Sequence, residues 1–62
     1  MKLEFDPIAD AAYFEISAAE IETTKEIEPG IIVDYDAKGH IVGIEVLSVS
    51  QRGLVKPVDE AA

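Results

Sequence analysis

Polar and apolar residues alternate in several short stretches of this chain, and each stretch predicts a β-strand. In residues 2–6 the alternation places Leu3 and Phe5 on one side of an extended segment. Asp6 and Pro7 end this strand, because proline has no amide donor and disfavours helical geometry in the residue before it. The chain therefore begins with a short strand followed by a turn.

Residues 11–17 fit two different elements. With Asp6 as an N-cap, a helical spacing of apolar residues predicts an amphipathic helix that contains Ile8, Ala12, Ile16 and Ala19. In an extended segment, one face instead carries Ala12, Phe14 and Ile16, and the other carries Tyr13 and Glu15. The pattern alone leaves both alternatives open.

Residues 20–28 alternate with an acidic periodicity. The even positions carry Glu20, Glu22, Thr24, Glu26 and Glu28, and the odd positions carry Ile21, Thr23, Lys25 and Ile27. This pattern predicts a strand with one solvated, acidic face. Such a face can discourage unwanted edge pairing, and it is also our candidate surface for binding a partner, through Glu20, Glu22, Glu26 and Glu28.

The second half of the chain predicts a β-hairpin. A turn at Pro29-Gly30 is followed by a β-branched strand at residues 31–35. Residues 36–39 supply the next turn, in which Gly39 suits a positive φ. The returning strand, residues 40–47, is apolar on most of both sides, so we expect it to be central or to lie at an interface.

The end of the chain predicts a short helix and a tail. Ser48 can cap a helix over residues 49–52, which Gly53 would end. The predicted fold is α+β but mostly β: a small antiparallel sheet of about five short strands in hairpins, with a short C-terminal helix. We expect one domain over residues 1–53 and a poorly ordered tail over residues 54–62.

Composition narrows the range of functions. The 62 residues include 13 acids and 5 lysines and arginines, for a net charge of −8, and eight of the acids lie in residues 1–30. This charge argues against nucleic acid and anionic membranes as partners. No cysteine is present, which excludes disulfides and thiolate chemistry. No apolar stretch resembles a targeting or membrane segment, so we expect a cytoplasmic protein.

Several sequence blocks, taken in their order along the chain, resemble one protein family. The blocks are Met1–Pro7, Asp10–Phe14, Gly30–Asp36 and Gly39–Leu47. Together they are similar to domain-of-unknown-function family 2283, a group of small, mostly bacterial proteins, over residues 1 to about 52. The resemblance implies a sheet of hairpins with a short C-terminal helix, and it favours a strand at residues 11–17. It also implies an antitoxin-like role, because members often lie beside genes for small toxins.

One segment has the spacing of a twelve-residue calcium loop. The positions that match are Asp34, Asp36, Gly39, Ile41 and Glu45. Lys38 places a cation where the loop needs an oxygen ligand, and β-branched strands flank the segment where the motif needs helices. We therefore interpret it as a hairpin turn, expect His40 to be a solvent-facing strand residue, and predict no metal site.

Nucleophilic and acid–base chemistry have little support in the sequence. Asp6 and Asp10 bracket a turn, and their expected role is local: Asp6 accepts backbone donors, and Asp10 is solvated or caps. Ser48 and Ser50 lack a nearby base. We predict no catalytic residue and no cofactor.

These observations lead to three hypotheses about function. The first is a non-enzymatic interaction domain that self-associates, with a dimer favoured, and that binds a small basic protein. The second is a metal-dependent or catalytic domain with a site at a dimer interface, built from Asp34, Asp36, His40 and Glu45. The third is a purely structural homo-oligomer whose acidity serves solubility.

Overall fold

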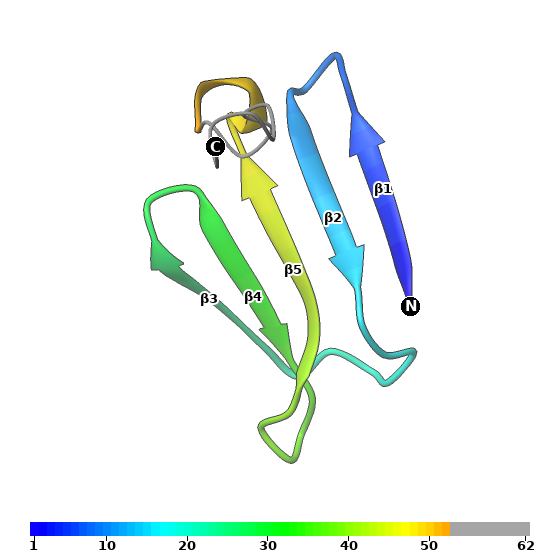
Figure 1. Ribbon diagram of the computed structural model, residues 1–62. Helices are drawn as coiled ribbons and strands as arrows, with labels where there is room; N and C mark the ends of the chain where they lie inside the picture. Colours follow the sequence, from blue (N-terminus) through cyan, green and yellow to red (C-terminus); the bar gives the residue numbers. More distant parts are fainter. Residues whose placement is uncertain (53–62) are drawn as a thin grey trace, which may run out of the picture.

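Five antiparallel strands form one sheet in the computed structural model, which describes residues 1–52 (Figure 1). The strands are β1 (Lys2–Asp6), β2 (Ala11–Glu15), β3 (Thr23–Glu28), β4 (Ile31–Tyr35) and β5 (Ile41–Leu47). Their spatial order is β1-β2-β5-β4-β3. The predicted mostly β fold is thus confirmed, and the structure decides the ambiguous residues 11–15 in favour of a strand.

β5 lies at the centre of the sheet, between β2 and β4. Its residues alternate between two faces that are both largely apolar, and a strand of this kind is stable only with neighbours on both sides. Val42 of β5 is 3% exposed and Val33 of β4 is 2% exposed. The sequence prediction of a central strand at this position is confirmed.

The connection over residues 16–22 sets the strand order. It leaves β2 beside β5, where the Ile16 and Ser17 amides both donate to the Val42 carbonyl, at 2.8 and 3.1 Å. It ends at β3, where the Glu22 amide donates to the Tyr35 carbonyl at 2.7 Å. β2 and β3, consecutive in sequence, are therefore separated by β5 and β4. This crossing needs residues 20–22, so β3 begins at Thr23 and not at the predicted position 20.

Cross-strand pairing divides the side chains between two faces. Because residues paired across a sheet share a face, one side carries an apolar set, which we call the apolar face: Leu3, Phe5, Ala12, Phe14, Ile31, Val33, Ile44 and Val46. The opposite side, which we call the polar face, includes Lys2, Glu4, Tyr13, Glu15, Ile32, Asp34, Gly43 and Glu45. The predicted facing of Leu3 with Phe5, and of Phe14 with Ala12, is confirmed.

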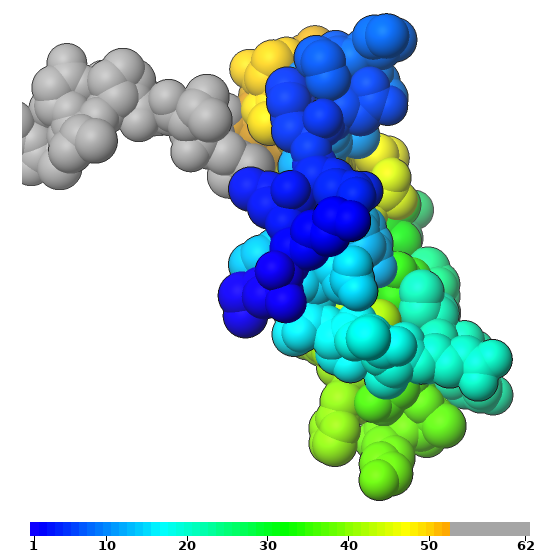
Figure 2. Space-filling view, turned by 90° about the vertical axis from the view of Figure 1, so that its right-hand side faces the viewer, coloured from blue at the N-terminus to red at the C-terminus, as the bar shows by residue number. Residues whose placement is uncertain are grey.

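Residues 1–52 contain no second layer against either face of the sheet. Seen from the β1 edge, the described residues form one tall and narrow layer (Figure 2). Among them, the hydrophobic side chains classed as buried are Ala11, Val33 and Val42. Apolar residues of the outer strands remain open, with Leu3 67% and Phe5 56% exposed. The same part of the chain has no helix that is long and apolar enough to cross a membrane.

The predicted C-terminal helix is wrong for the described residues. β5 is followed by a single 3-10 turn, η1 (Val49–Gln51), and the predicted Ser48 cap makes no side-chain hydrogen bond. Ser48 instead adopts a left-handed backbone with φ 54°, which turns the chain sharply away from β5. The predicted tail, residues 54–62, lies outside the described residues.

Two side chains anchor η1 to the sheet. The Asp10 carboxylate accepts hydrogen bonds from the Ser50 amide at 3.1 Å and from the Ser50 hydroxyl at 2.8 Å, and so takes the role that was predicted for Ser48. The Arg52 guanidinium donates to the Leu47 carbonyl and, at 2.7 Å, to the Pro29 carbonyl. η1 is therefore held to the β1–β2 turn and to the β3–β4 turn.

We expect Asp10→Ala to lower the free energy of unfolding by about 1 kcal/mol, as for other lost caps. The substitution removes the acceptor of the Ser50 amide, and it places alanine in a left-handed conformation, φ 56°. Urea denaturation at equal protein concentration measures the change. Asp10→Asn is the matched control, because asparagine tolerates this conformation and keeps an acceptor. Equal losses in both variants would contradict the capping role.

Candidate functional site

The segment with calcium-loop spacing is a hairpin turn between β4 and β5. Asp36 Oδ1 accepts the amides of Lys38 at 2.9 Å and His40 at 2.8 Å, and the Asp36 carbonyl accepts the Gly39 amide at 3.0 Å. Gly39 has φ 84°, as predicted. Hydrogen bonds from the His40 amide, and secondarily from Lys38, hold the pKa of Asp36 below its usual value, although desolvation opposes them.

The other residues of the calcium-loop pattern do not converge on Asp36. Asp34 lies on the polar face and Glu45 lies in the central strand, opposite Tyr13 and Ile32. Across residues 1–52, no group of three histidine or acidic side chains is placed to hold a metal ion. Within one chain, the arrangement required by a metal-dependent site is therefore not assembled.

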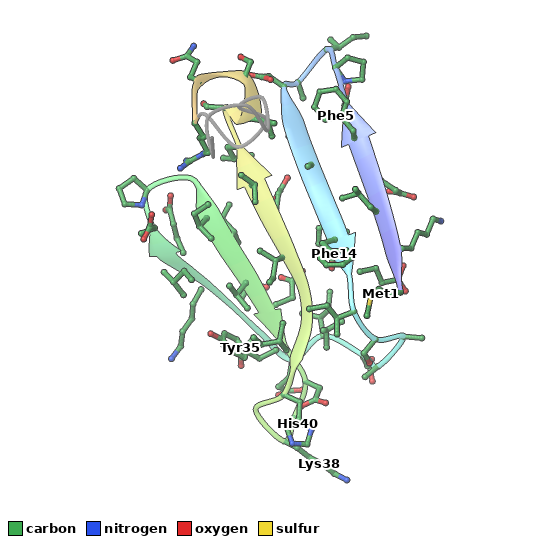
Figure 3. The ribbon with its side chains drawn as sticks, viewed as in Figure 1. Met1, Phe5, Phe14, Tyr35, Lys38 and His40 are labelled. Carbon is green, nitrogen blue, oxygen red and sulfur yellow. The ribbon has the colours of Figure 1, made fainter. Side chains whose placement is uncertain are left out.

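His40 lies at the exposed end of the same turn. Its Nδ1 is 3.8 Å from Asp36 Oδ2, and its side chain is largely open to solvent. Figure 3 shows His40 and Lys38 projecting from the β4–β5 turn, away from the body of the sheet. The expected exposure of His40 to solvent is confirmed, but its predicted place in a strand is wrong, because β5 begins at Ile41.

Asp6 and Asp10 have the local roles that the sequence indicated. Asp6 Oδ1 accepts the amides of Ile8 at 3.0 Å and Ala9 at 3.3 Å, which closes the turn that begins at Pro7. Asp10 caps η1 and also engages the Ser50 hydroxyl. Each carboxylate is thus used to hold the backbone at the β1–β2 end of the molecule.

A polar network that the sequence did not reveal crosses the middle of the sheet. The Tyr13 hydroxyl, from β2, donates to Asp34 Oδ2 of β4 at 3.0 Å, and the Thr24 hydroxyl of β3 donates to Asp34 Oδ1 at 2.6 Å. Tyr13 crosses over β5 at Gly43, where a Cβ atom would lie 2.0 Å from the tyrosine oxygen. Gly43 is therefore required by a close approach. The strand order, which brings these residues together, could not be read from local periodicity.

The four acids of the predicted binding face are all exposed but lie in different settings. Glu20 and Glu22 belong to the connection before β3, and Glu26 and Glu28 belong to β3 itself. A bulge around Ile27 places Glu26 opposite Ile32 and Glu28 opposite Ile31, so these two carboxylates lie on different faces. Glu26 also accepts the Gly30 amide at 2.9 Å. We call the set Glu20, Glu22, Glu26 and Glu28 the acidic edge.

The polar face carries further acids that the sequence reasoning did not group. Pairing places Glu4, Tyr13 and Glu45 side by side across β1, β2 and β5, with Glu15 two positions along β2. A groove on this side is lined by Glu4, Tyr13 and Glu45 together with Ala9 of the β1–β2 turn and neighbouring residues of β1 and β2. Each acid alternates with apolar residues within its own strand. Which acids lie beside it in the sheet depends on pairing between strands that are far apart in sequence.

The apolar face contains a groove of the opposite character. It has a volume of about 270 Å³ and is lined by Leu3, Ala12, Phe14, Ile44, Val46 and Val49. Phe5 and Phe14, on neighbouring strands, both belong to this face (Figure 3). Val49 comes from η1, so the anchored 3-10 turn forms one wall. The groove offers hydrophobic contact and no charged group.

The Tyr13–Asp34 contact predicts a specific response to alkaline pH. Desolvation, and secondarily the hydrogen bond to Asp34, raises the pKa of Tyr13 above the usual 10.0. Neutral Tyr13 therefore contributes stability that is complete below pH 10.0 and is lost as the pH rises through the folded-state pKa. Ultraviolet titration of phenolate should show Tyr13 ionising above this value.

Tyr13→Phe provides the control for this titration, because it leaves Tyr35 as the remaining tyrosine. Its stability should fall less steeply above pH 10.0 than that of the unsubstituted protein. Ionisation of Tyr13 at or below its usual pKa would contradict the network.

Comparison of the sequence with known protein families finds a matching family model. A family model described as "Protein of unknown function (DUF2283)" matches residues 2–50, which include all five strands. No significant match is found among curated proteins or among solved structures. Because the match covers most of the 62 residues, and as the resemblance of the sequence blocks predicted, this chain belongs to the DUF2283 family of proteins of unknown function.

Proposed function

We propose that this protein is a non-enzymatic interaction domain that self-associates and binds a basic protein partner. The observation that carries the proposal is the separation of its surfaces, with an uncharged apolar face on one side of the sheet and acids on the polar face and the acidic edge. The apolar face suits self-association, and the acidic surfaces suit a basic partner. The finer role, that of an antitoxin which binds a small basic toxin, rests on the family resemblance, and the cytoplasmic location rests on the sequence, in which no apolar stretch resembles a targeting segment.

The environment of the titratable groups supports a binding role over catalysis. In residues 1–52, every polar or charged side chain is at least partly exposed to solvent. A pair of catalytic carboxylates needs burial or close coupling to separate the two pKa values. The carboxylates of Asp6, Asp10, Asp34 and Asp36 are each used in hydrogen bonds within the sheet and its turns.

The acidic edge supports a basic partner. All six residues of β3 are exposed, and among residues 1–52 β3 is an outer strand with a strand neighbour on one side alone. Glu20, Glu22 and Glu28 make no hydrogen bond or ion pair through their carboxylates among the described residues, whereas Glu26 is used by the β3–β4 turn. Complementary charge speeds and orients protein association, so these three carboxylates are the groups on which a basic surface would act.

We expect the triple variant Glu20→Gln, Glu22→Gln, Glu28→Gln to bind the basic partner about tenfold more weakly, since each exposed ion pair is worth about 0.5 kcal/mol. Glu26 is left in place because its carboxylate accepts the Gly30 amide. The partner is captured from native lysate at low salt, identified by mass spectrometry and then titrated in purified form. Its affinity should fall as salt rises.

The matched control is the triple variant Glu4→Gln, Glu15→Gln, Glu45→Gln, which removes the same charge from the polar face. It should retain most of the affinity. Equal losses in both variants would show that net charge, and not the acidic edge, drives binding. Failure to capture a salt-sensitive basic protein would overturn this part of the proposal.

A further inference from the structure

The contacts among residues 1–52 leave much of the apolar face uncovered. Protein domains bury the apolar side of a sheet against a second layer, and residues 1–52 provide one layer. Leu3, Phe5 and Phe14 are 67%, 56% and 39% exposed. Contiguous exposed apolar surface of this kind marks an interaction site in stable proteins.

Charge is almost absent from this face. One cross-strand row runs Leu3, Phe14, Ile44 and Val33, and ends at Lys25 on β3. The next row runs Phe5, Ala12, Val46 and Ile31, and ends at Glu28 on β3. The four strands β1, β2, β5 and β4 therefore present no charge on this side. A basic partner has nothing to recognise there.

We propose that two copies of this chain pack apolar face against apolar face and form a two-layer β-sandwich with both polar faces outward. This inference specifies the self-association that the proposed function contains and rests on that part of it. Each copy supplies the layer that the other lacks, in the closed two-fold arrangement that is commonest among protein oligomers.

The area of the face approaches what such a dimer needs. Five strands about 4.8 Å apart and about 18 Å long cover on the order of 400 Å² in projection. The projected areas of two such faces sum to on the order of 850 Å², close to the ~1,000 Å² of a specific interface. This sum leaves out the additional surface of the protruding side chains. The ten residues after Arg52 contain Leu54, Val55 and Val58 as their large apolar residues and are about the length of one or two strands, too little to cover five.

The distribution of acids permits this dimer in spite of the net charge of −8 on each chain. The polar faces point away from the contact, across two sheets that pack about 10 Å apart. At physiological ionic strength the Debye length is about 8 Å, so most of the repulsion between the two outer surfaces is screened. Added salt should therefore strengthen self-association and weaken binding of a basic partner.

The test compares two substitutions of the same type by analytical ultracentrifugation. Leu3→Glu places a charge on the apolar face, and we expect the dissociation constant of the dimer to rise about tenfold or more, as for an interface anchor. Ile8→Glu is the matched control, because Ile8 is 97% exposed in the β1–β2 turn, off the apolar face. The Ile8→Glu variant should dimerise with the same dissociation constant as the unsubstituted protein.

A second measurement keeps the test decisive if Leu3→Glu fails to fold. In an equimolar mixture of isotope-labelled and unlabelled protein, nuclear Overhauser contacts between chains should join the Phe14 ring of one copy to the Ile44 and Val46 methyl groups of the other. A monomeric protein at all concentrations and salts, or contacts between chains confined to β1 or β3, would overturn the sandwich. Either result leaves salt-sensitive capture of a basic protein unaffected, so the two proposals fail separately.

Discussion

The pairing of β5 with both β2 and β4 is the constraint on which the whole sheet depends. β1 and β2 form one hairpin, and β3 and β4 form another, but no strand of one hairpin pairs with a strand of the other, and β5 joins the two. A two-stranded hairpin is marginal in water, whereas five strands that share one ladder are not. The long apolar run of β5 is therefore what converts two weak units into one fold. The most buried valines, Val42 and Val33, lie on β5 and its neighbour β4.

The polar network on the other side of β5 follows from the same arrangement. β5 separates Tyr13 from Asp34, and Gly43 is the one residue of β5 that lets the tyrosine pass over it to reach the carboxylate. The network links β2, β4 and β3 through side chains, in addition to the backbone ladder. A larger residue at position 43 would close this route, because its Cβ would occupy the position of the tyrosine oxygen.

Local pattern predicted the elements of this fold well, and long-range contacts account for what it missed. Alternation in residues 2–6 and 40–47, and turn residues such as Gly39, act over a few positions and can be read directly. The strand order depends on pairing between residues far apart in sequence, so the grouping of Glu4, Glu15 and Glu45 could not be found. Local pattern predicts Ser48 as the cap of η1, but the side chain that caps it, Asp10, lies forty residues from Ser50.

The acidic edge and the apolar face differ in chemistry and meet at Glu28, which ends one row of that face, so one small sheet can make two contacts. Face-to-face packing covers the sides of a sheet but leaves its outer strands open. β3 therefore stays available to a basic protein while the apolar face is covered by a second copy. Its charges also protect it, because exposed acids and Lys25 on an outer strand oppose pairing with a further strand. The same residues thus favour a partner of opposite charge and disfavour growth of the sheet.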